Sequence, residues 1–189
     1  MERIAPLEPT IATGAVKPLF DGVQAKLGAV PNLFRVLGTA PAALSGYLNL
    51  SGALASGSFD GRLREQIALT VAETNHCGYC LSAHTFIGAR LGLTEQAIAD
   101  ARHAVASTPR TDAILKLARA IVVCRGELGH GEFEAARAAG LTDGDVIETI
   151  ANVAVNIFSN YVNHIAGTPI DFPEVTLGNG YSKPASSCA

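Results

Sequence analysis

The sequence carries little charge and has no run of basic residues. Charged residues make up 16% of its 189 residues, and the formal net charge at pH 7 is −3. Non-specific binding of nucleic acid depends on clustered lysine and arginine side chains that neutralise phosphates. The charge pattern therefore argues against a nucleic-acid-binding protein.

Long apolar runs are also missing. The most apolar region, residues 146–157, is interrupted by Glu148, Asn152 and Asn156, and a membrane-spanning helix needs about 20 predominantly apolar residues. The first ten residues, MERIAPLEPT, include no apolar segment of the kind found in signal peptides. We expect a cytoplasmic protein whose cysteines are reduced at rest, so a Cys-x-x-Cys pair indicates redox or metal chemistry rather than a static crosslink.

The sequence shows no alternating strand pattern and no Gly-x-Gly-x-x-Gly segment. Without that glycine-rich turn there is no sign of a nicotinamide or flavin site, and we expect no cofactor. Hydrophobic residues nevertheless reach 48% of the chain. This composition predicts either a helical core rich in alanine and leucine or extensive burial between subunits.

Helix start and stop signals predict a single all-α domain over residues 1–189, with seven or eight helices. Residues 1–13 are expected to form an extended arm and residues 167–189 a coil tail. Asp60, Thr94 and Thr142 are the expected N-caps, because each side-chain oxygen can accept a free amide hydrogen of a first helical turn. The expected helices are 15–27, 41–54, 62–73, 77 or 78 to 91, 94–104, 111 or 112 to 124, 132–139 and 142–164, with a short turn at 31–37.

The residues best suited to chemistry lie in the middle of the chain. Cys77 and Cys80 form a Cys-x-x-Cys pair, and His84 follows four residues later. At about 100° per residue, these three side chains fall within roughly 60° on one helix face. The thiols can close a reversible disulfide, and the imidazole, one turn from Cys80, can carry a proton or stabilise a thiolate.

Glu65 precedes Cys77 by twelve residues. In one unbroken helix it would lie about 18 Å from Cys77 and on a different face. A break at residues 74–76 would make two antiparallel helices and bring Glu65 level with His84. Use of Glu65 therefore predicts that break. Otherwise Glu65 is a solvated helix charge, and Glu73 is the competing carboxylate.

Alternative uses of the same residues are open. Cys77, Cys80 and His84 could supply three ligands to zinc, but a structural site needs a fourth ligand and rarely has its cysteines inside a helix. Redox use is therefore favoured, and we expect no metal. Tyr79 either belongs to the core or covers the site. His76 is either a turn residue or a second proton carrier.

The remaining histidines and cysteines are expected outside the site. His103 and His130 have the setting of surface residues. Cys124 lies in an apolar helical run and is expected to be a small buried hydrophobe. Cys188 lies in the predicted coil tail and is expected to have no role.

The spacing resembles that of the alkylhydroperoxidase AhpD-like group of the carboxymuconolactone decarboxylase superfamily. The pattern of that group is a glutamate, eleven residues, Cys-x-x-Cys, three residues and a histidine, which Glu65, Cys77, Cys80 and His84 match. The segments REQIAL (64–69), Asn163-His164 and PIDFP (169–173) are similar to a branch described as peroxidase-related. The resemblance extends from about residue 30 to residue 173.

This resemblance implies an AhpD-like helical bundle that forms homo-oligomers, often trimers or hexamers, and that reduces hydroperoxides. In the family the second cysteine, here Cys80, attacks the peroxide and becomes a sulfenic acid. The first, here Cys77, protonates the leaving group and then closes the disulfide. Glu65 and His84 are the implied proton relay. Electrons are expected from an external dithiol or protein reductant.

The chain departs from the best-known members of the group at one position. Those members carry histidine before the second cysteine, where this chain has Tyr79, and a phenol with a pKa near 10 is a poor proton carrier at neutral pH. Either His76 substitutes or the relay is shorter. In addition, the helix N-terminus by itself favours Cys77 as the more acidic thiol.

Two further functions fit the same residues. Glu65 and His84 could serve as base and acid in a decarboxylase-like or isomerase-like enzyme. Alternatively, the dithiol could act as a redox sensor without turnover. The peroxidase hypothesis leads, because the resemblance implies it and because decarboxylase members of the superfamily lack this cysteine pair.

Overall fold

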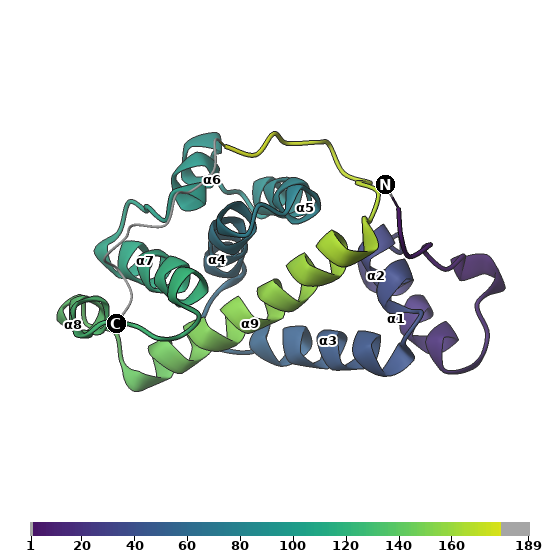
Figure 1. The fold of residues 1–189 in the computed structure, drawn as a ribbon, viewed down its shortest axis with the longest axis horizontal. Helices are drawn as coiled ribbons and strands as arrows, with labels where there is room; N and C mark the ends of the chain where they lie inside the picture. The colour runs from purple at the N-terminus through teal and green to yellow at the C-terminus, as the bar shows by residue number, and fades with distance from the viewer. Residues whose placement is uncertain (1, 179–189) are drawn as a thin grey trace.

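The computed structural model describes residues 2–178, and within that range the chain forms only helices and loops (Figure 1). The all-α prediction is confirmed. Nine α-helices follow two short 3₁₀ turns, Pro9–Ile11 and Gly14–Val16. The helices are α1 (Lys17–Leu27), α2 (Asn32–Leu37), α3 (Pro41–Leu54), α4 (Gly61–Thr74), α5 (Gly78–Arg90), α6 (Glu95–Arg102), α7 (Pro109–Cys124), α8 (His130–Ala138) and α9 (Asp143–Ala166).

Helix α4 lies at the centre of the bundle and packs against α5, α6, α7 and α9 (Figure 1). Its second half is buried on every side, from Ile67 to Glu73. A helix that is buried all round has no solvent face to fill with charged residues, which explains the run IALTVA in this segment. The helix is therefore held firmly in the core next to the site.

Helix α9 is the longest helix and crosses the molecule beside α3 (Figure 1). It begins with a capping box, in which the Thr142 hydroxyl accepts the Asp145 amide at 3.1 Å and the Asp145 carboxylate accepts the Thr142 amide at 2.9 Å. The predicted cap at Thr142 is thus confirmed, as are the caps at Asp60 and Thr94. This fixes the start of a helix that contacts α2, α3, α4, α5 and α7.

The chain reverses between α4 and α5, as predicted. The His76 amide donates to the Glu73 carbonyl at 3.1 Å, and the Cys77 amide donates to the Ala72 carbonyl at 2.9 Å. These two bonds form a Schellman motif, which requires a left-handed residue after the helix end. His76 takes that conformation, with φ at +54°. Strain of about 1–2 kcal/mol is usual for a non-glycine residue there.

The C-terminal segment 168–178 forms an extended strap over α4 and α5 (Figure 1). The Val175 amide donates to the Ser82 hydroxyl at 3.0 Å, and the Gly178 amide donates to the Glu73 carboxylate at 2.7 Å. The predicted coil is therefore coil in its described part, but it is packed against the bundle. Of the described helices, none is long and apolar enough to cross a membrane.

Candidate active site

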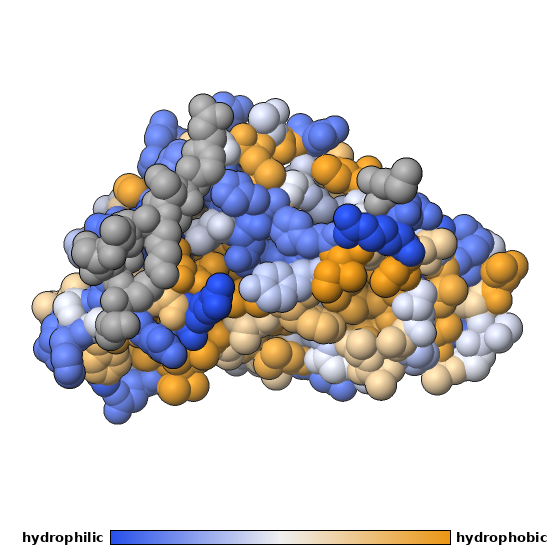
Figure 2. Space-filling view, in the orientation of Figure 1, coloured by the Kyte–Doolittle hydropathy of each residue, from blue (hydrophilic) through white to orange (hydrophobic). Residues whose placement is uncertain are grey.

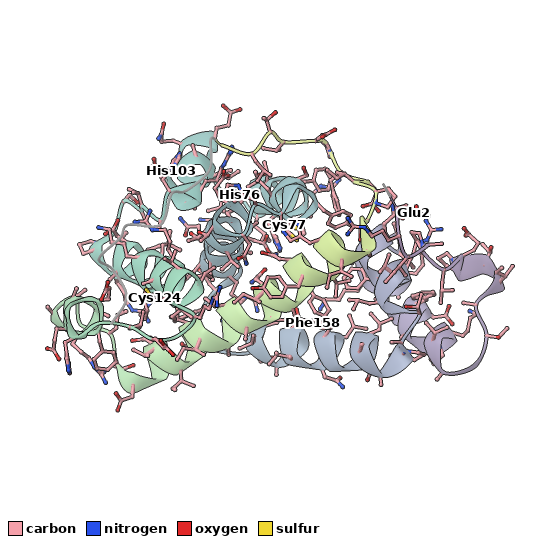
Figure 3. All side chains as sticks on the ribbon, viewed as in Figure 1. Glu2, His76, Cys77, His103, Cys124 and Phe158 are labelled. Carbon is pink, nitrogen blue, oxygen red and sulfur yellow. The ribbon has the colours of Figure 1, made fainter. Side chains whose placement is uncertain are left out.

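The two thiols lie at the start of α5, where the chain leaves the reversal. Figure 3 labels Cys77 and the neighbouring His76 at this point. Cys77 is the N-cap of this helix, and its Sγ accepts the Cys80 amide at 3.3 Å. Both cysteines are free, and their exposed fractions are only 1% and 2%. The turn at His76 thus fixes one sulfur over the first turn of α5 and the other inside that turn.

The pKa values of the two thiols are displaced in opposite directions. A hydrogen bond from the Cys80 thiol lowers the pKa of Cys77, and although burial opposes this, the Cys80 amide and the charge of His84 add to the lowering. Burial raises the pKa of Cys80 well above its ordinary value, and the neighbouring Cys77 raises it further. Cys77 is therefore the more acidic of the two thiols, as its position at the helix N-terminus predicts.

Two amide side chains of α9 surround Cys80. The Asn163 Nδ2 donates to Cys80 Sγ at 3.2 Å, and Asn160 also acts to lower the pKa of this thiol. The Asn160 Oδ1 accepts from Asn75 at 3.0 Å. The Asn160 Nδ2 and the Asn163 Oδ1 are buried without a partner. Side-chain amide hydrogens from α9 are therefore placed to stabilise a thiolate at Cys80.

Glu65 and His84 form the second part of the site. The His84 Nδ1 lies 2.8 Å from the Glu65 Oε2, and 18% and 16% of the two side chains are exposed. Burial acts to lower the pKa of His84, but the Glu65 carboxylate, its hydrogen bond and the Cys77 thiolate together raise it. The prediction that the break brings Glu65 level with His84 is thus confirmed.

The other candidates are exposed or bonded to other parts of the chain. Tyr79 is buried, and its hydroxyl accepts the Leu33 amide at 3.1 Å. This side chain belongs to the core beneath α2, and burial raises its pKa. His76 is exposed in the reversal. Glu73 is held by Arg102 at 2.6 Å and by the strap.

The remaining predictions concern histidines, cysteines and metal. His103 and His130 are exposed and Cys124 is buried, as predicted. Cys188 lies outside the described residues. Within residues 2–178, no three His, Cys, Asp or Glu side chains are grouped so that they could hold a metal ion.

A cavity of about 560 Å³ lies among α1, α3, α4, α5 and α9. Glu65 and His84 line it, whereas neither cysteine does. Tyr47 also lines it, and its hydroxyl shares a hydrogen bond with Ser159. Burial raises the pKa of Tyr47, and the charges of Cys80 and Glu65 raise it further. Tyr47 is thus a neutral hydroxyl close to both halves of the site.

Sequence reasoning missed Tyr47, Asn160 and Asn163 as site residues. The only sequence signal is a repeat of asparagine at 152, 156, 160 and 163, every three or four residues along α9. That spacing places four amides on one helix face, and all four are buried. Asn152 and Asn156 interrupt an apolar run and Asn163 belongs to a segment similar to the peroxidase-related branch, and neither observation points to the thiols.

Residues 41–122 match the carboxymuconolactone decarboxylase family. The matched region runs from α3 into α7 and includes the dithiol, Glu65 and His84. Among curated proteins, none is significantly similar to this chain in sequence.

Several crystal structures have a similar fold. An uncharacterized peroxidase-related protein from Ralstonia eutropha JMP134, described as an alkylhydroperoxidase AhpD core, is 26% identical with a TM-score of 0.73, over 90% of this chain and 94% of that one. A peroxidase-related protein from Silicibacter sp. TM1040 is 21% identical with a TM-score of 0.75, over 89% and 92%. The debrominase Bmp8 is 22% identical with a TM-score of 0.76, over 89% and 91%.

Proposed function

From the membership of this chain in the carboxymuconolactone decarboxylase superfamily, with an AhpD-like fold, we propose that it is a thiol-dependent peroxidase. The observation that carries the proposal is the pair of free, buried thiols with opposite pKa displacements. Such a pair supplies one thiolate and one thiol, and it lies beside a proton-carrying Glu65–His84 pair. These groups meet the needs of hydroperoxide reduction at a dithiol.

The first step uses the thiolate of Cys77 as a base. Its own proton has passed to the Glu65–His84 pair, and the Cys80 thiol donates a hydrogen bond to it. When the Cys80 sulfur attacks the terminal oxygen of the hydroperoxide, the Cys80 proton moves to Cys77 and the O–O bond breaks. The leaving alkoxide takes that proton and departs as an alcohol. Cys80 is left as a sulfenic acid.

The second step closes the disulfide. The Cys77 thiolate attacks the sulfur of the Cys80 sulfenic acid, the S–S bond forms, and hydroxide leaves. His84 returns the stored proton to hydroxide and gives water. The peroxide has then taken two electrons from the dithiol, and an external dithiol or protein reductant restores the thiols by exchange.

The position of Cys80 sets a condition on this route. Because neither sulfur lines the cavity, a peroxide must pass the cavity wall to reach Cys80. Tyr47 is the lining side chain whose hydroxyl senses the charge of Cys80. We propose that the peroxide passes from the cavity to Cys80 at the position of Tyr47.

A second candidate is acid–base catalysis by Glu65 and His84 in a decarboxylase-like or isomerase-like reaction. One observation favours it: this pair lines the cavity and the thiols do not. The similar protein Bmp8 is a debrominase, and one of its crystals holds 2,3,4-tribromopyrrole. A brominated pyrrole therefore belongs among the assay substrates. A redox sensor without turnover is the third candidate.

The decisive experiment follows peroxide consumption with dithiothreitol as reductant in the wild type, Cys80→Ser, Cys77→Ser and Glu65→Gln. We expect one equivalent of peroxide to remove two hydrogen atoms from the wild-type protein by mass spectrometry. Cys80→Ser abolishes consumption, and Cys77→Ser leaves a sulfenic acid on Cys80 that a dimedone reagent traps.

Each competing function predicts a different result. Full peroxide turnover by Cys80→Ser contradicts the cysteine mechanism. Activity that survives the paired Cys77→Ser and Cys80→Ser substitutions favours acid–base catalysis. A peroxide-induced change of oligomer size with negligible turnover favours the sensor.

We also propose a cytoplasmic homo-oligomer, a trimer or a hexamer. The outer face of α9 exposes apolar side chains along its whole length, and Figure 2 shows hydrophobic side chains gathered over this helix. We call this set the α9 stripe: Ile147, Ile150, Ala154, Phe158, Tyr161 and Ile165. Its spacing of three and four residues is that of a helix face that packs against another helix, and we assign it to a second copy of the chain.

A further inference from the structure

The side chains that line the cavity have a net positive charge, although the chain as a whole is negative. Two cations line it, Lys26 and Arg64, and one carboxylate, Glu65. Glu65 is engaged with His84 at 2.8 Å. Two positive charges less one negative charge leave an excess of one, whereas the whole chain has a net charge of −3. The cavity is therefore a local positive region on an acidic protein.

Arg64 is the cation that lacks a partner where one is expected. It is half-buried, and its guanidinium makes no hydrogen bond or ion pair with any other residue that the structure describes. By contrast, Arg102 and Arg110 pair with carboxylates at 2.6 and 2.5 Å. Glu65 is adjacent in sequence, but neighbouring residues of a helix do not face each other.

An unpaired, partly desolvated guanidinium favours an anion from outside the chain. Its five N–H donors form a planar fork that matches the two oxygens of a carboxylate or a phosphate. Removing the charge from water is costly unless such a partner is supplied. Arg64 is thus prepared for the head group of a ligand.

Most of the remaining wall is apolar and suits a hydrocarbon tail. The volume of the cavity, about 560 Å³, lies within the range of roughly 300–1,000 Å³ for small-molecule sites. Helices α1, α2, α3, α5 and α9 all contribute apolar side chains. Among them are Leu19, Val23, Phe34, Leu48, Ile87 and Val155.

We propose that this cavity binds an anionic amphiphile, with its carboxylate or phosphate head on Arg64 and its apolar tail along the walls. This rests on the proposed function, because it makes the substrate an amphiphilic organic hydroperoxide rather than hydrogen peroxide. Lys26 is exposed at the rim and adds a weaker, salt-sensitive attraction. Arg64 is then a specificity-determining residue.

Binding is tested without turnover by calorimetric titration of the full chain. The ligands are decanoate, decyl phosphate and the uncharged 1-decanol. The proteins are the wild type, Arg64→Gln, Arg64→Lys and, as a matched control on the same helix, Arg62→Gln. Arg62 lines a different surface, where it donates to the Leu91 carbonyl at 2.8 Å. Because the Arg64 side chain makes no hydrogen bond or ion pair among the described residues, we expect its replacement to leave the fold intact, which circular dichroism checks.

We expect an anionic ligand to bind the wild type and Arg62→Gln alike and to bind Arg64→Gln about 10- to 100-fold more weakly. Arg64→Lys falls between them because it keeps the charge and loses the fork. Comparison of decanoate with decyl phosphate identifies the head group. Equal binding of 1-decanol, equal binding by Arg64→Gln, or no binding by any of the three ligands overturns the proposal.

A kinetic arm separates this inference from the proposed function. The ratio of kcat/KM for a fatty-acid hydroperoxide to that for cumene hydroperoxide should fall about tenfold or more in Arg64→Gln and stay constant in Arg62→Gln. If no hydroperoxide is turned over while decanoate binding still depends on Arg64, the peroxidase proposal fails and the anion site stands.

Discussion

Cys77 and Cys80 are three residues apart, yet their surroundings differ in kind. Cys77 accepts a backbone amide at a helix N-terminus, and Cys80 is enclosed by side chains of α9. The first environment favours a thiolate and the second keeps a thiol protonated until a partner takes its proton. In the proposed reaction, the resemblance and the electrostatics describe two stages: Cys77 is the thiolate at rest, and Cys80 attacks once Cys77 has accepted its proton.

The amide of Asn163 is expected to set how readily this pair ionises. Its hydrogen bond lowers the pKa of both thiols, so Asn163→Leu, which removes the donor and keeps the bulk, should reduce the thiolate fraction at pH 7 by about tenfold. The rate of iodoacetamide alkylation, followed against pH, measures the change. Asn49→Ala, an exposed asparagine of α3, serves as the control. An unchanged alkylation profile in Asn163→Leu would show that Asn163 does not act on the sulfur.

The site residues that lie close together in sequence could be predicted, and those contributed by distant segments could not. The dithiol, His84 and Glu65 follow from spacing along two consecutive helices, and one reversal is enough to join them. Asn163 lies 83 residues from Cys80, and its position depends on how α9 crosses α5. No local pattern encodes that crossing, so the amide neighbours and Tyr47 emerge only from the tertiary structure.

At the scale of elements, the loop before α4 is tied to α9 by one carboxylate. The Glu148 Oε2 accepts the Ser58 amide at 3.0 Å and its hydroxyl at 2.6 Å, and the Glu148 Oε1 accepts the Phe59 amide at 2.9 Å. Burial acts to raise the pKa of Glu148, but these three bonds outweigh it and lower the pKa. This contact holds the start of α4 against α9.

Glu148→Gln should therefore lower the free energy of unfolding by about 1–2 kcal/mol at pH 7. A carboxyl whose pKa is depressed in the folded state stabilises the protein at pH values above the ordinary carboxyl pKa of about 4.3. That contribution is lost as the pH falls through the lower folded pKa. The gap between wild type and Glu148→Gln should therefore narrow in acid. Urea titrations at several pH values measure it, with the exposed Glu134→Gln as control; a gap independent of pH would contradict the assignment.

Helix boundaries show which local signals carry information. The caps at Asp60, Thr94 and Thr142 were predicted because capping is a contact within four residues. The sequence predicts that α7 starts at Thr111 or Asp112, whereas it starts at Pro109 with Thr108 as its cap. Proline at the first helical position is itself a start signal that the prediction did not use. The turn expected at 31–37 is largely the short helix α2.

At the scale of the whole molecule, the α9 stripe has the largest consequence. Phe158→Glu should shift the protein to smaller species, because a buried unpaired charge opposes apolar association. Analytical ultracentrifugation measures the change. Val105→Glu, which adds the same charge to another exposed apolar position, is the matched control. Identical sedimentation of Phe158→Glu and wild type would remove the stripe from the interface.

The architecture as a whole was within reach of the sequence. Helical signals predicted an all-α bundle, and the spacing of four side chains indicated the superfamily that residues 41–122 match. The strap and the cavity were not predicted, because both depend on segments far apart in the chain. Residues 168–178 read as coil from composition, and only their bonds to Ser82 and Glu73 show that they pack.

One sulfur atom serves both as the N-cap of α5 and as the proposed partner in a disulfide. The Cys80 amide donates to that atom in the reduced protein. Formation of a disulfide at Cys77 should therefore change the chemical shift of the Cys80 amide hydrogen. Its NMR resonance, and the rate at which it exchanges with deuterium, become an internal gauge of the oxidation state. The gauge needs no substrate or dye, and it reports from inside the first turn of the helix.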